Sequence, residues 1–123
     1  MEGESGMNKR KLGQEKEQAV EEYLRAKGYK ILARNFRNRF GEIDLIAKDA
    51  EIIVFVEVKY RSAPDCGMAA EAVDRRKQKT ITNVARYYLM THGGNEWTPC
   101  RFDVLAIDGD VITHIPNAFY AGT

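Results

Sequence analysis

The sequence is poor in the features that mark several large classes of protein. Its 123 residues include two cysteines, Cys66 and Cys100, which lack metal-ligand spacing and are too few for a disulfide scaffold. No run of eighteen apolar residues occurs, so we expect no transmembrane helix. The N-terminus has no apolar stretch of the kind found in an ordinary signal peptide. These absences favour a cytoplasmic protein with reduced thiols and no membrane partner.

The net charge is also small. It is +1 at pH 7, although 30% of the residues are charged and 44% are apolar. This balance is ordinary for a globular protein, and it gives no overall sign of nucleic-acid binding. A chain of this length is expected to form one domain. We expect residues 1–8 to be a disordered leader or an expression remnant, and residues 9–123 to form that domain.

Hydrophobic periodicity predicts two helices and five strands. The helices are expected at about Lys9–Lys27, followed by Gly28, and at about Ala69–Thr91, where His92-Gly93-Gly94-Asn95 ends the pattern. The strands are expected at Tyr29–Phe36, Glu42–Ala47, Ile52–Tyr60, Arg101–Ile107 and Val111–Ile115. The order α-β-β-β-α-β-β predicts an α/β fold with a mixed central β-sheet flanked by helices.

Charged residues at the ends of two of these strands are the most informative feature. Glu57-Val58-Lys59 follows the apolar run Ile52–Val56, and Asp44 lies inside the apolar segment Glu42–Ala47. Asp, Glu and Lys are depleted in strands, and burying them without a partner is costly. Strand alternation puts Glu57 and Lys59 on one face of the sheet.

The link between these strands decides whether Asp44 meets Glu57. A two-residue turn at Ala50 and Glu51 places the two acids directly opposite each other, and a turn one residue earlier makes them diagonal neighbours. A three-residue link without a bulge would put them on opposite faces. In the first two registers the carboxylates lie within about 5–8 Å. One of them would then be protonated unless a cation intervenes.

Two interpretations of this pattern stay open. In one, Asp44 and Glu57 hold Mg²⁺, which takes one or two carboxylates together with waters and substrate phosphate. Lys59 then assists the attack of water on a phosphodiester. In the other, Lys59 forms a cross-strand salt bridge with Asp44 or Glu42, worth about 1 kcal/mol or less if exposed.

Further short motifs accompany these charged residues, and together they span essentially all of the sequence after Lys9. They are Tyr23-Leu24, Gly28-Tyr29, Asn35-Phe36-Arg37, Gly41-Glu42-Ile43-Asp44-Leu45-Ile46, Val54-Phe55-Val56-Glu57-Val58-Lys59 with Arg61, Lys77-Gln78, Arg101-Phe102-Asp103-Val104 and Asn117-Ala118-Phe119. Together they resemble the PD-(D/E)xK nuclease superfamily. Within it, the match is closer to the YraN-type family of predicted endonucleases, which are similar to archaeal Holliday junction resolvases.

The resemblance implies a restriction-endonuclease-like fold and a metal-dependent nuclease core. It implies Asp44, Glu57 and Lys59 as the catalytic set, with Asp44 and Glu57 as the ligands of Mg²⁺ or Mn²⁺. Superfamily members often add a Glu from the first helix, and the position that lines up is Glu17. The family's usual Gly just before it is Lys16 here, and Glu21 on the same helix edge is a competing candidate.

Basic residues gather in three segments, around Lys30–Arg39, at Lys59–Arg61 and at Arg75–Lys79. Such clusters suit contacts with phosphates, although each also fits a solvated surface. Lys77 lies on the apolar stripe of its helix, so it either faces a site or extends outward along its stem. Gln78 is placed to bond substrate or Lys59. The residues that we expect to bind nucleic acid are Arg34, Arg37, Arg39, Arg61, Arg75, Lys77 and Gln78.

Other candidates favour structural roles. His92 and His114 are isolated, Trp97 fits a packing role, and Asp103 in an apolar strand is expected to pair with an Arg rather than a metal. The sequence thus predicts an endonuclease acting on DNA, with branched or structured DNA favoured because no recognition domain is appended. The alternative is a non-catalytic nucleic-acid-binding module that keeps the nuclease fold. A homodimer is the expected form of so small a chain if it acts on two strands.

Overall fold

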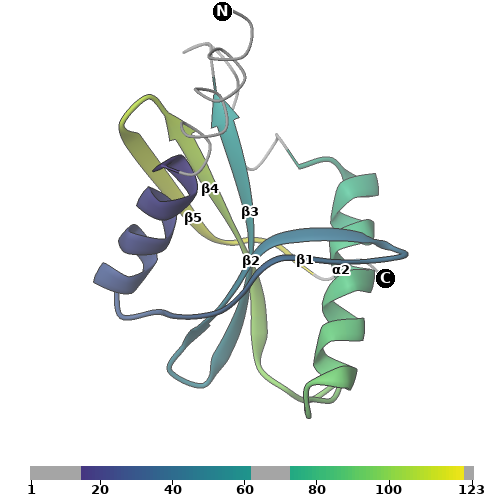
Figure 1. Ribbon diagram of the computed structural model, residues 1–123. Coiled ribbons are helices and arrows are strands. Elements are labelled where there is room, and N and C mark those ends of the chain that lie inside the picture. Colours follow the sequence, from purple (N-terminus) through teal and green to yellow (C-terminus); the bar gives the residue numbers. More distant parts are fainter. Residues whose placement is uncertain (1–14, 62–72, 121–123) are drawn as a thin grey trace, which may run out of the picture.

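The computed structural model describes residues 15–61 and 73–120 (Figure 1). The leader expected over residues 1–8, the loop expected over Ser62–Gly67 and the side chain of Arg61 lie outside this part of the chain. None of the helices within it is long and apolar enough to cross a membrane.

A five-stranded mixed sheet forms the centre of the molecule, as predicted. Its strands follow one another in space in chain order, and β3 and β4 are parallel while the other neighbours are antiparallel. The strands are β1 (Lys30–Asn38), β2 (Gly41–Asp49), β3 (Ile52–Arg61), β4 (Cys100–Asp108) and β5 (Val111–Phe119). This arrangement, with one helix before β1 and one between β3 and β4, is consistent with a restriction-endonuclease-like fold.

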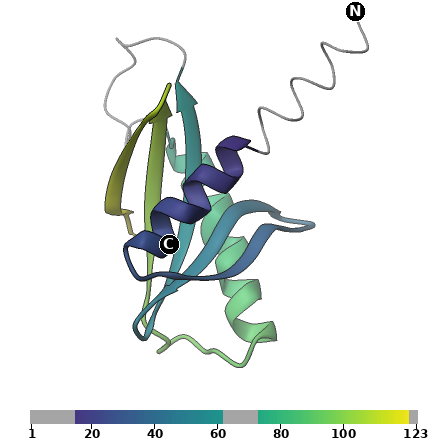
Figure 2. The same ribbon diagram turned by 60° about the vertical axis from the view of Figure 1, so that its left-hand side comes forward.

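The two helices cover opposite faces of the sheet (Figures 1 and 2). The first is helical over residues 15–26 and packs Val20 and Leu24 into one apolar cluster with β2, β3 and β4. The second, α2 (Arg75–Thr91), packs Val84 and Tyr88 against Phe55 in a separate cluster. Each face of the central strands is therefore buried, which explains their nearly continuous apolar sequences.

The start of α2 differs from the prediction. Val73 and Asp74 are not helical, and the helix begins at Arg75 rather than near Ala69. Asp74 is the N-cap: it has extended backbone angles, and its side chain accepts a hydrogen bond from the Lys77 N–H at 2.8 Å. The predicted end at Thr91 is confirmed, with His92 as the C-cap.

Two tight turns set the positions of β2. Asp49 pairs with Ile52, so the β2–β3 link is the two-residue turn Ala50-Glu51, with Ala50 at φ 53°. At its other end β2 begins at Gly41, which has φ 154°. A Cβ there would collide with the side chain of Thr80, so only glycine allows the β1–β2 hairpin to lie this close to α2.

Candidate active site

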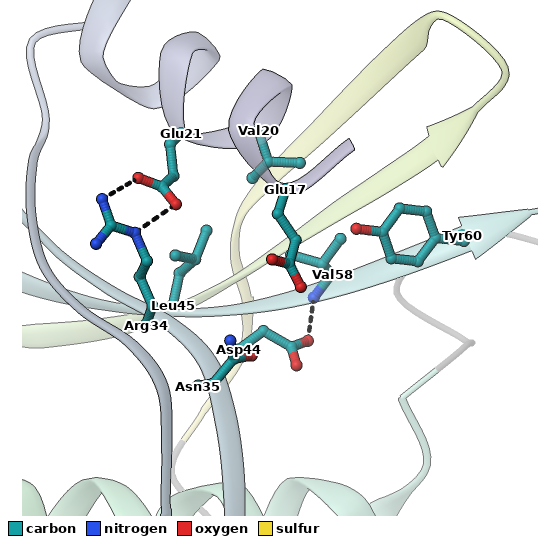
Figure 3. A pocket seen from close by; sticks show the side chains of 9 residues that line it. All are labelled: Glu17, Val20, Glu21, Arg34, Asn35, Asp44, Leu45, Val58 and Tyr60. Atoms are coloured by element: carbon teal, nitrogen blue, oxygen red, sulfur yellow. Dashed lines mark hydrogen bonds and ion pairs between the residues drawn. The ribbon is translucent and has the colours of Figure 1, made fainter. Parts of the chain in front are cut away.

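Asp44 lies at the point where β2 and β3 separate. The pairing of the two strands ends at Leu45 and Val56. One residue further, the Asp44 carboxylate takes the place of a backbone acceptor, because its Oδ2 accepts a hydrogen bond from the Val58 N–H at 2.8 Å (Figure 3). Nothing in residues 15–61 or 73–120 donates to Oδ1. Asp44 is thus held firmly through one oxygen and can offer the other.

Glu57 comes from the adjoining position of β3 and is almost completely buried. Its Oε1 lies 3.0 Å from Nζ of Lys77, on the α2 side of the sheet. Burial raises the pKa of Glu57, and repulsion by Asp44 raises it further, whereas the bond to Lys77 acts in the opposite direction. The pKa of Asp44 is raised as well, chiefly by burial. The two acids therefore share one electrostatic environment in which negative charge is unfavourable.

The β2–β3 register is the first of the three arrangements left open by the sequence, but the two acids do not share one face of the sheet as that register was expected to give. Continued by one residue, the pairing would set Asp44 opposite Glu57, which is the first of the three arrangements considered. However, Ile43 and Ile46 both pack in the α2-side cluster, so the alternation breaks between them. Asp44 consequently opens toward a cavity beneath the first helix, while Glu57 points toward α2.

Lys59 is partly buried and lies two residues beyond Glu57. It lowers the pKa of both Asp44 and Glu57 electrostatically. The cross-strand salt bridge considered for Lys59 is not formed within the described chain, since Glu42 pairs with Arg37 instead. Its ammonium therefore remains available beside the two acids.

A cavity of about 90 Å³ joins Asp44 to the first helix (Figure 3). Glu17 extends into it from the helix, toward Asp44, and Tyr60 closes one side. Burial raises the pKa of Tyr60, and the charges of Glu17 and Asp44 add to this effect. Glu17, the helix acid selected from the sequence, thus faces Asp44 across the cavity.

The competing acid on the same helix has a structural role. Glu21 is buried, and its two oxygens accept hydrogen bonds from Nε and Nη2 of Arg34 at 2.6 and 2.7 Å. The hydrogen bond from Arg34 holds the pKa of Glu21 below its ordinary value. This bidentate pair ties the first helix to β1 and forms one wall of the cavity. Glu17 is therefore the acid of this helix that remains free to act in the cavity.

Carboxylate oxygens are the type of ligand that a hard divalent cation prefers, and Asp44 and Glu57 come from adjoining positions of β2 and β3. A cation of this kind would offset the repulsion that the partly buried Asp44 exerts on the buried Glu57, and Mg²⁺ needs only one or two carboxylates, with waters and substrate phosphates as its other ligands. Across residues 15–61 and 73–120, no group of three or more His, Cys, Asp or Glu side chains is arranged to hold a metal by itself. A metal bound by the predicted pair, Asp44 and Glu57, would therefore take its remaining ligands from water and substrate.

The residues predicted to contact nucleic acid whose side chains the structure describes differ in whether a protein group already binds them. Arg34 is bonded to Glu21, and Arg37 lies 3.2 Å from Glu42 with most of its side chain exposed. Arg39 stacks over Phe40, and Arg75 is exposed at the start of α2. Lys77 is bonded to Glu57, and the amide of Gln78 donates to the Val73 carbonyl rather than to Lys59 as expected. The sequence did not predict the protein partners of Arg34, Arg37, Lys77 and Gln78.

Sequence reasoning missed or misjudged several side chains. Asn35 and Tyr60 line the cavity. Both residues could have been found from the sequence. Asn35, which adopts φ 49°, lies in the motif Asn35-Phe36-Arg37, and strand alternation from Val58 places Tyr60 on the cavity side. Trp97 is 83% exposed, so the packing role expected for it is wrong.

Asp103 does pair with an Arg, as predicted. It is fully buried and accepts hydrogen bonds from Arg101 at 3.0 Å and from the Asn117 N–H at 2.9 Å, and it lies 2.7 Å from Nε2 of His114. Burial alone would raise the pKa of Asp103, but His114, Arg101 and Asn117 together hold it below its ordinary value. This network joins β4 to β5, and neither Asp44 nor Glu57 takes part in its hydrogen bonds.

The protein is an α/β protein, and its mixed five-stranded sheet and flanking helices are consistent with a restriction-endonuclease-like fold. A model described as "Uncharacterised protein family UPF0102" matches residues 16–107, and the chain belongs to this family. The matched region contains Glu17, Asp44, Glu57, Lys59 and Lys77.

Similar relatives extend over nearly the whole chain, and each carries the name UPF0102 protein. One from Lachnoclostridium phytofermentans is 49% identical over 115 residues, which cover 94% of this chain and 98% of the relative. One from Aeromonas hydrophila is 49% identical over 108 residues, covering 87% and 83%. One from Thermodesulfovibrio yellowstonii is 46% identical over 109 residues, covering 89% and 96%.

Proposed function

We propose that this protein is a metal-dependent endonuclease that hydrolyses phosphodiesters in DNA, with branched or structured DNA as its substrate. The observation that carries the proposal is the pair of electrostatically coupled carboxylates, Asp44 and Glu57, at the separating ends of β2 and β3. Acids whose pKa values are raised by burial and mutual repulsion are typical of functional sites. The PD-(D/E)xK resemblance of the same residues points to nuclease chemistry.

Each side chain has a defined task in this reaction. Asp44 and Glu57 would hold Mg²⁺ or Mn²⁺, which supplies the positive charge that lowers the pKa of a water and polarises the phosphodiester. Lys59 stabilises negative charge that develops on the phosphate. Glu17, directed at Asp44 across the cavity, orients the attacking water or accepts its proton. The Val58 N–H fixes the Asp44 carboxylate so that its second oxygen keeps one orientation.

The surroundings of the site offer contacts for DNA. The β1–β2 hairpin, which carries Arg37 and Arg39, approaches α2 through Gly41 and Thr80, one turn beyond Lys77. Exposed Arg75 begins the same helix. Positive charge on both elements can contact phosphates without reading sequence, as expected for an enzyme that selects DNA by shape. The proposal also includes a homodimer, in which each copy cuts one strand, and a cytoplasmic location.

Cleavage of a four-way DNA junction, with linear duplex as the comparison substrate, tests the proposal. With Mg²⁺ or Mn²⁺ the wild-type protein should cut the junction, and chelation should stop it. Asp44→Asn and Glu57→Gln should lower the rate by at least about 10²-fold, because each removes a metal ligand. Lys48→Ala, at an exposed position toward the other end of β2, is the matched control and should cut at the wild-type rate.

The alternative, a non-catalytic binding module, gives a different set of results. It predicts junction binding without cleavage under every metal condition, and binding that Lys59→Ala leaves unchanged. If the protein binds neither junction nor duplex at low salt, both nucleic-acid functions are wrong.

A further inference from the structure

The cation bonded to Glu57 is a lysine from α2 and not the lysine of the Glu57-Val58-Lys59 motif. Nζ of Lys77 lies 3.0 Å from Oε1 of Glu57, whereas Lys59 forms no ion pair with any described residue. Of the two lysines, Lys77 also lowers the pKa of both Asp44 and Glu57 more strongly. Lys77 therefore already provides the positive charge that the paired carboxylates require.

The position of Lys77 is determined by the start of α2. It is the third residue of the helix, and its backbone N–H is held by the Asp74 cap at 2.8 Å. From there the side chain reaches the sheet. The side chain of Glu57 is 6% exposed and that of Lys77 is 44% exposed. Glu57 thus cannot turn toward water, whereas the ammonium of Lys77 can move out into solvent.

An ammonium and a divalent cation cannot occupy one carboxylate without repelling each other, and in a buried site that repulsion is strong. Building on the endonuclease function proposed above, we propose that Lys77 competes with the divalent cation for Glu57, so that metal binding requires the ammonium to leave. Lys77 is thereby a positioning residue that holds Glu57 in place and sets the metal affinity of the site. The wild-type protein therefore binds the divalent cation more weakly than its two carboxylates would without Lys77.

Metal titration without DNA tests this competition directly. Mn²⁺ binding is measured by calorimetry or by electron paramagnetic resonance on the full chain and its variants. Lys77→Met keeps most of the apolar stem but removes the charge, and it should bind Mn²⁺ about five- to tenfold more tightly, the effect of losing one competing ion pair. Lys77→Arg keeps the charge and should bind no more tightly than wild type.

Lys79→Met is the matched control, because Lys79 is exposed on the same helix and has no ion pair with a described residue. Its Mn²⁺ affinity should equal that of wild type. If wild type binds Mn²⁺ and Lys77→Met binds it no more tightly, the competition is wrong while the proposed function stands. If none of these variants binds Mn²⁺, the proposed metal-dependent function is wrong. Should Lys77→Met fail to fold, Lys77→Gln provides the same comparison.

Discussion

Asp44 and Glu57 carry charges that oppose folding. Burial raises the pKa of each group, and their mutual repulsion adds to this for Glu57. When a carboxyl has a higher pKa in the folded state, the folded protein holds a proton that the unfolded chain has released. Its stability therefore decreases as the pH rises from the ordinary carboxyl value, about 4, through the folded-state pKa. A divalent cation bound as proposed would offset this cost, which would link metal affinity to pH.

Glu57→Gln should therefore stabilise the metal-free protein. The amide carries no charge to bury or to repel Asp44, and Lys77 can leave for solvent because it is 44% exposed. We expect a gain of about 1 kcal/mol at pH 8, or roughly 4 °C in Tm, that shrinks as the pH falls toward 4. Thermal unfolding with and without Mn²⁺ measures it, and the variant should lose the metal-induced rise in Tm. A variant less stable than wild type at pH 8 would contradict the unfavourable burial of Glu57.

Asp103 shows the opposite behaviour with an equally buried carboxylate. Its bonds to His114, Arg101 and the Asn117 N–H hold its pKa below the ordinary value, so it adds stability above about pH 4 that is lost as the pH falls through the lower folded-state pKa. We expect Asp103→Asn to cost about 3 kcal/mol at pH 7, because it leaves Arg101 and His114 without their shared acceptor.

Urea unfolding at several pH values checks the prediction for Asp103. The difference between wild type and Asp103→Asn should become smaller as the pH falls below about 4, where the unfolded chain takes up a proton that the folded carboxylate still resists. Asp108→Asn, at the exposed end of the same strand, is the control and should change stability by less than about 0.5 kcal/mol. A difference that stays constant from pH 7 to pH 3 would show that the charge of Asp103 is not what stabilises the network.

At the scale of the element, the first turn of α2 connects stability to the site. Asp74 caps the helix by accepting from the Lys77 N–H, and Lys77 in turn bonds Glu57. Asp74→Ala should cost about 1 kcal/mol of stability, because the first turn loses its acceptor. Asp74→Ser restores an acceptor and should recover most of that loss in urea unfolding. If Ala and Ser behave alike, the cap does not stabilise the helix.

The same helix shows where sequence reasoning succeeds and where it stops. Its apolar stripe and its end were predicted because periodicity and the Gly93-Gly94 pair are local signals. Its start was placed too early because Val73 fits the stripe, although Val73 packs in the core from outside the helix. Similarly, β5 continues past the predicted Ile115 to Phe119, since the Asn117 N–H is held by the distant Asp103 rather than by local preference.

In the candidate site, too, the sequence predicts some features and not others. Asp44, Glu57 and Lys59 could be selected because charges inside apolar strands are conspicuous. The sequence could not decide the register of β2 against β3. The turn that sets it has Ala50 at φ 53°, a conformation that alanine rarely adopts and that the sequence therefore does not predict. The bond from Lys77 to Glu57 depends on how α2 packs across the sheet, and no spacing along the chain encodes that distance.

At the scale of the whole molecule, the arrangement of charge matters more than its sum. The net charge of +1 hides local differences: Glu57 and Asp103 are buried in the sheet, whereas Arg37 and Arg39 lie on the β1–β2 hairpin and Arg75 begins α2. Arg34 and Arg37 already pair with acids of the protein. Contacts with DNA should therefore depend more on the arginines that remain unpaired in the described chain, of which Arg75 is one.

Salt dependence of junction binding measures this contribution. Arg75→Ala should weaken binding to junction and duplex alike, and it should reduce the slope of log K against log salt by about 1, the effect of losing one phosphate contact. Arg86→Ala is the matched control, since Arg86 is exposed on the same helix but lines a cavity with Leu89 and Met90 toward its other end. Its slope should equal that of wild type. Equal losses in the two variants would mean that DNA is attracted by general charge rather than by contacts at the start of α2.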